Sequence, residues 1–137
     1  MKQAQILRLY WNLVGIVDIK NMNFTFKIQV QEWKNVLLRG HSPEDMSRYW
    51  SGFTSAEAKV KEQAGAIRFS NDNPQLNLTL NHFIREHETL GEKYRDAKAL
   101  YLSRQFDAKA ADKIVRGVDR APSNLLTRLA NLVSKSA

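Results

Sequence analysis

Residues 23–40 read NFTFKIQVQEWKNVLLRG and decide the fold, because they complete a helical pattern that begins near Lys2. Apolar residues recur along this pattern at alternating steps of three and four, which is the period of an α-helix. A new helix start follows directly, with Ser42 as a natural N-cap and Pro43 at the first helical position. A helix over residues 2–39 would span about 55 Å, so we expect an elongated bundle.

Two seams run along this predicted first helix, and they differ in character. The first seam is apolar for most of its length and consists of Leu9, Ile16, Ile19, Phe26, Val30, Trp33 and Leu37. The second seam is apolar in its first half and carries lysines in its second half. It consists of Ile6, Tyr10, Leu13, Val17, Lys20, Phe24, Lys27, Gln31, Lys34 and Leu38. A helix in a small bundle buries one apolar stripe in its own core, so we expect a partner chain to cover the other.

Three further helices are predicted from the rest of the chain. The third shows a heptad seam made of Leu76, Leu80, Phe83, His87, Leu90, Tyr94, Ala97 and Tyr101. In the last helix Asp107 is a candidate cap, and Pro122 either kinks the helix or opens its main part. The sequence therefore predicts an all-α, elongated, antiparallel up-down-up-down four-helix bundle in a single domain covering 1–137. Its helices are expected at about 2–39, 43–69, 75–104 and 108–136.

Composition and motifs argue against catalysis and against a cofactor. The 137 residues contain no cysteine, no G-x-S-x-G, no H-E-x-x-H and no P-loop. His82 and His87 are five residues apart and do not share a helix face, so we expect no metal site and assign His87 to the core. Aromatic residues at seam positions are likewise assigned to the core rather than to a ligand cage; they are Trp33, Trp50, Tyr94 and Tyr101.

The net charge of +7 favours an anionic partner. The lysines and arginines are scattered, with no run of four, so we expect no nucleic acid as partner. A basic helical adaptor that binds nucleic acid or protein stays as the alternative. No stretch of eighteen apolar residues is present, so no transmembrane helix is predicted within the sequence.

Cations gather at two places that the predicted fold would bring to the same end of the bundle. Lys27 and Lys34 share a face late in the first helix, and Arg116 and Arg120 flank the weak point of the last helix. A pocket between them would suit an anion. The alternative is that these residues are surface charges and that Asp119 forms a salt bridge with an arginine.

Three stretches resemble one family. They are residues 26–40 (FKIQVQEWKNVLLRG), residues 92–94 (EKY) and residues 116–123 (RGVDRAPS). With the long first helix, they look like the periplasmic sensor domain of bacterial methyl-accepting chemotaxis receptors of the aspartate- and serine-receptor type. The resemblance implies the periplasmic domain of an inner-membrane protein, with transmembrane helices before residue 1 and after residue 137. It also implies a homodimer packed through the first helix, and control of a cytoplasmic histidine kinase through a small sliding of the fourth helix.

The resemblance also suggests where a ligand, an amino acid or an organic acid, would bind. The aspartate receptor of this family uses three arginines on the first helix and a Pro-Thr pair on the fourth. Pro122 and Ser123 are similar to that pair, whereas the arginine positions fall at about Thr25, Val30 and Lys34. Because only Lys34 is charged, the aspartate-type clamp is not reproduced, so the ligand is either less charged or has its carboxylate held by Arg116 or Arg120 instead. We therefore expect an organic acid rather than an amino acid, and the resemblance implies that it binds at the membrane-distal end of the dimer interface. The candidate ligand-binding residues are Thr25, Gln29, Lys34, Arg116, Arg120 and Ser123.

Overall fold

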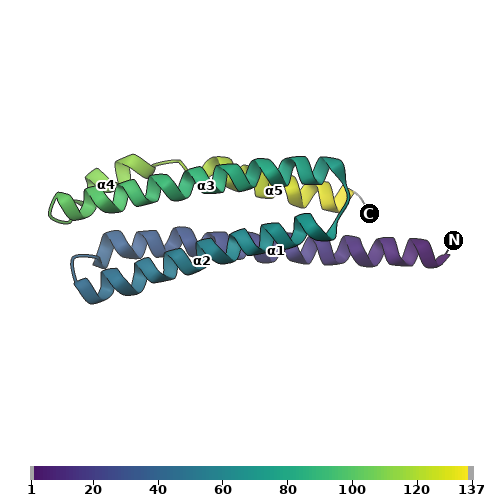
Figure 1. The fold of residues 1–137 in the computed structure, drawn as a ribbon, viewed down its shortest axis with the longest axis horizontal. Coiled ribbons are helices and arrows are strands. Elements are labelled where there is room, and N and C mark those ends of the chain that lie inside the picture. Colours follow the sequence, from purple (N-terminus) through teal and green to yellow (C-terminus); the bar gives the residue numbers. More distant parts are fainter. Residues whose placement is uncertain (1, 136–137) are drawn as a thin grey trace.

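The computed structural model describes residues 2–135, and these form five α-helices with no strand (Figure 1). The helices are α1 (Lys2–Arg39), α2 (Pro43–Ser70), α3 (Pro74–Ser103), α4 (Ala108–Val115) and α5 (Arg120–Lys135). The all-helical prediction is confirmed. Figure 1 shows an elongated molecule with both chain termini at one end, called here the terminal end. The α1–α2 and α3–α4 links lie at the opposite end, called here the link end.

One helix was predicted over 108–136, but the structure shows two, α4 and α5. Residues 116–119 separate α4 from α5. Gly117 has φ of +78°, in the left-handed region that an α-helix does not use. Pro122 lies in the first turn of α5, where its missing N–H removes no helical hydrogen bond. Of the two possibilities for Pro122, the structure therefore shows the one in which it opens a helix.

Side-chain caps account for the starts of α3 and α4. Asn73 caps α3 by accepting hydrogen bonds from the backbone N–H groups of Gln75 and Leu76, at 3.0 and 3.2 Å. Asp107 caps α4 by accepting from Ala110 N at 3.1 Å, as predicted. Ser42 occupies the N-cap position of α2 with extended backbone angles, but its side chain makes no capping hydrogen bond.

The core lies along the predicted α3 seam. All eight residues of that seam are buried, from Leu76 to Tyr101. Phe26 and Trp33 of the first seam of α1 reach the α3 seam, with ring centroids 6.2 Å from Phe83 and 5.2 Å from Tyr94. Ile19 of the first seam is 1% exposed and belongs to the same core cluster. Leu9 was expected in the same seam but is 52% exposed, because the start of α1 runs past the ends of the neighbouring helices (Figure 1). Among the described residues, the first seam is thus an inner face from Ile16, in the fourth turn of α1, onward.

The second seam of α1 faces solvent. Its apolar members are all more than half exposed; they are Ile6, Tyr10, Leu13, Val17, Phe24 and Leu38. The lysines of this seam are exposed as well. Within residues 2–135, no helix combines the length and the apolar character needed to cross a membrane.

Candidate ligand-binding site

Two of the six candidate ligand-binding residues are buried and make hydrogen bonds inside the protomer. The Thr25 side chain is 5% exposed and donates its hydroxyl hydrogen bond to the Asn21 carbonyl at 2.9 Å. Gln29 is fully buried, and its Oε1 lies 2.7 Å from Nε2 of His87. Both side chains therefore face the core, and a ligand on the surface of the protomer reaches neither without a rearrangement.

The other four candidates lie nearer to solvent. Lys34 is exposed on the second seam of α1. Arg116 is 3.8 Å from Asp112, and its side chain is 70% exposed. The guanidinium of Arg120 lies beside Gly117, since a Cβ there would be 3.7 Å from its central carbon. Ser123 is half-buried, and its backbone N–H donates to the Asp119 carbonyl at 3.0 Å. Within the described part of the chain, none of the six candidates lines the three cavities considered below.

A polar layer crosses the core, and the sequence analysis found only part of it. His87 is 1% exposed, and burial lowers its pKa from 6.5 to about 4, although the charge of Glu57 opposes this. The imidazole is therefore neutral at pH 7 and donates from Nε2 to Gln29 Oε1. The Nε2 amide of Gln29 is buried and has no partner among the described residues.

The same region contains an ion pair between α2 and α3 in which the carboxylate is buried and the guanidinium reaches solvent. Glu57 is 4% exposed and accepts two hydrogen bonds from the guanidinium of Arg95, one of them at 3.1 Å. The hydrogen bond to Glu57 raises the pKa of Arg95. Gly91 makes room for the carboxylate, because a Cβ at this position would collide with Glu57 Oε2. In the sequence, Glu57 is a charged residue inside the apolar stripe of α2, which indicates a buried charge. Its partner Arg95 could not be identified from residue spacing.

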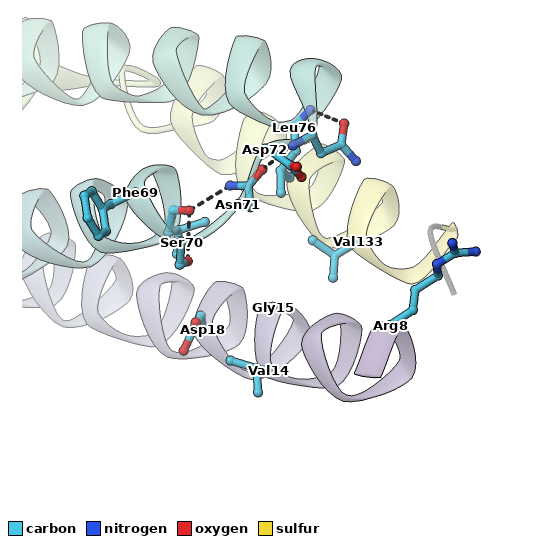
Figure 2. Close-up of a pocket in the computed structure, with 12 residues that line it drawn as sticks. Arg8, Val14, Gly15, Asp18, Phe69, Ser70, Asn71, Asp72, Leu76 and Val133 are labelled. Atoms are coloured by element: carbon cyan, nitrogen blue, oxygen red, sulfur yellow. Dashed lines mark hydrogen bonds between the residues drawn. The ribbon is translucent and has the colours of Figure 1, made fainter. Parts of the chain in front are cut away.

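A cavity of about 680 Å³ lies near the terminal end (Figure 2). Figure 2 shows the α2–α3 turn above Asp18 of α1, with Val133 of α5 on another wall. A Cβ at Gly15 would be 3.2 Å from Val133, so α1 and α5 approach closely there. The side chain of Asn71 bonds Ile67 O, Asn77 Oδ1 and Asn73 N, and so serves to fix the turn.

The charges around that cavity are of both signs, since Arg8, Asp18 and Asp72 all line it. Mixed charge does not favour an anionic ligand. The other two cavities measure about 460 Å³ at the link end and about 280 Å³ between α2 and α3. Among the described residues, no group of three or more His, Cys, Asp or Glu could hold a metal ion. His82 instead lies on the surface, 3.6 Å from Glu86.

Comparison with known proteins identifies a relative. No protein-family model matches the chain, and no solved structure gives a significant match. A region of 103 residues, 75% of the chain, is 39% identical to the methyl-accepting chemotaxis protein CtpH of Pseudomonas aeruginosa. The matched region covers 18% of that receptor's length. The relationship points to a non-enzymatic receptor, in agreement with the sequence prediction. The chain is therefore a relative of the methyl-accepting chemotaxis proteins, and it matches one segment of such a receptor.

Proposed function

We propose that the chain is the extracytoplasmic sensor domain of an inner-membrane chemoreceptor, and that it binds a small organic acid at a dimer interface formed by α1. In this proposal residues 1–137 act as a single antiparallel up-down-up-down unit, with α4 and α5 together as its fourth member. The observation that carries the proposal is the exposed second seam of α1, which changes from apolar to cationic along its length.

The apolar half of this seam supports a homodimer. Ile6, Leu13 and Val17 are each more than half exposed and follow one another on the same face. Full burial of such a side chain contributes about 1.5–3 kcal/mol, so a few pairs across a two-fold axis would stabilise association. Leu13→Glu should therefore weaken the dimer in sedimentation experiments while leaving the far-UV spectrum unchanged. An unchanged monomer–dimer equilibrium would remove this support.

The cationic half of the seam supports an anion site. Lys20, Lys27 and Lys34 recur every seven residues, so in a parallel dimer each would face its counterpart across the axis. Like charges at such short range repel, and a bound carboxylate would offset this repulsion. Arg116 and Arg120 are exposed beside the α4–α5 break and would supply further charge. A ligand held between α1 and this break would bias the position of α5, to the extent that it binds one packing better than the other.

A thermal-shift screen with organic acids at fixed ionic strength tests this proposal. A ligand at a hundredfold excess over its Kd stabilises the folded state by about 2.7 kcal/mol. We expect a selective rise in Tm that Lys34→Ala and Arg120→Ala abolish. The control Lys93→Ala, at an exposed position on α3, should keep the response. A shift with polyanions alone, which salt abolishes, would instead support the basic adaptor.

A further inference from the structure

We propose that each protomer carries a second binding site, for a small aromatic monocarboxylate, in the cavity at the link end of the bundle. This site is separate from the proposed dimer-interface site and lies within one protomer. The cavity of about 460 Å³ has the α1–α2 link and the start of α2 on one side, and the end of α3 with the α3–α4 link on the other. Nothing in it requires a partner chain.

The walls of this cavity are mostly apolar. Met46 and Trp50 of α2 face Leu102 of α3 and Phe106 of the following link across the opening. Binding sites for small organic molecules are typically concave, lined by apolar and aromatic side chains, and furnished with a few polar groups that orient the ligand. The four side chains provide such walls for an aromatic ring.

One cation is held at this cavity. The Nζ of Lys98 lies 4.5 Å from the ring centroid of Trp50, in a cation–π contact that restrains the ammonium group. Trp50 is itself restrained by Phe53, whose ring is stacked on it with centroids 4.8 Å apart. The described residues that line the cavity include no Asp or Glu. No Asp or Glu elsewhere in the described part of the chain lies within ion-pair distance of Lys98 either. Lys98 is therefore an ordered cation without a counterion, which suits a carboxylate.

The backbone of the α3–α4 link holds an aromatic ring at the cavity. Gln105 and Phe106 have φ values of 55° and 66°, a left-handed backbone conformation that residues other than glycine rarely adopt. Phe106 N donates to the Tyr101 carbonyl at 2.7 Å, and the two rings meet edge to face at 5.6 Å. Phe106 remains 44% exposed despite these contacts. This hydrogen bond and ring contact are those of a Schellman motif, which ends α3 and places the Phe106 ring at the cavity.

Charge and polarity limit the ligand to a monoanion. Lys98 neutralises one carboxylate, and His41 is exposed at the edge of the cavity. Lys98 is the one lysine or arginine among the described residues that line the cavity, so a second carboxylate on the same ligand would lie beside Ser47, Ser51 or the apolar walls without a second lysine or arginine to neutralise it. The organic acids with two or three carboxylates that would suit the lysines of α1 therefore do not suit this cavity.

Benzoate is the probe for the test, and neutral benzamide is its matched control. We expect calorimetry to show one benzoate per protomer, with benzamide binding about tenfold more weakly or worse, because benzamide offers the Lys98 ammonium a neutral carbonyl oxygen in place of a carboxylate. Lys98→Gln should abolish this preference, whereas Lys93→Gln should keep it. Phe106→Gly should weaken both compounds and leave their ratio unchanged. Far-UV circular dichroism of every variant checks the fold.

The double variant Lys34→Ala/Arg120→Ala separates this proposal from the proposed function. Benzoate binding should survive in that variant even when the response to other organic acids is lost. The proposal is wrong if benzoate does not bind at about 10 mM, a concentration that detects even weak complexes. It is also wrong if the preference for benzoate persists in Lys98→Gln or disappears in the double variant.

Discussion

Acidification from pH about 7 to about 4.5 should lower the free energy of unfolding by about 2 kcal/mol through His87 alone. Burial holds the pKa of this imidazole at about 4, against 6.5 in the unfolded chain. The charges of Lys61 and Arg95 act in the same direction, and that of Glu57 opposes them. The unfolded state therefore binds the proton first. The stabilising contribution is complete above pH 6.5 and is lost as the pH falls towards about 4.

The magnitude follows from the difference between the two pKa values. Each pH unit in this window removes up to about 1.4 kcal/mol, and the full difference corresponds to about 3 kcal/mol. Most of the loss occurs above pH 4.5, because the folded protein begins to protonate His87 only near that value. Most carboxylates titrate at lower pH, at about 4 in unfolded chains, so their contribution overlaps little with this window.

Urea unfolding of the wild type and of His87→Gln across this pH range provides the assay. Glutamine does not titrate and can still donate to Gln29, which makes it a suitable control for the buried hydrogen bond. We expect the stability of the variant to be nearly independent of pH between about 6.5 and 4.5, while that of the wild type falls. Parallel curves for the two proteins would refute the reasoning, because they would show that the pKa of His87 is similar in the folded and unfolded states.

Two further predictions use matched positions in urea unfolding. Gly91→Ala should lower the free energy of unfolding by about 2 kcal/mol, because the new methyl group displaces the buried carboxylate of Glu57. Gly65→Ala should raise it by about 1 kcal/mol, since a Cβ there meets nothing within 4 Å and alanine favours the helix; equal effects would contradict the clash. Asn73→Ala should cost about 1 kcal/mol through loss of a helix cap, whereas Ser42→Ala should cost little, because its side chain makes no capping bond. A similar loss at both caps would show that the hydrogen bonds of Asn73 do not matter.

The exposure of the candidate site residues followed the sequence expectation only in part. Lys34, Arg116 and Arg120 were expected to be available to a ligand, and all three are exposed. Thr25 and Gln29 were placed in the same site by position along the helix, but they face the core. A shift of one or two residues along a helix turns a side chain by roughly 100° or 200°, so a register taken from helix ends does not determine which face a residue occupies.

The sequence by itself determined the elements that depend on near neighbours. Cap chemistry marked the start of α4, and the heptad pattern marked eight of the ten buried residues of α3, because these signals arise within a few turns of one helix. It also showed that α1 has two seams, but not which of them faces the core.

Only the tertiary structure decided how the helices meet. It paired Glu57 with Arg95, 38 residues away, and Gln29 with His87, 58 residues away. It also brought Lys98 of α3 over Trp50 of α2 at the link end. Such contacts depend on the relative rotation and register of packed helices, which the whole core sets at once and which the periodicity of one helix does not contain.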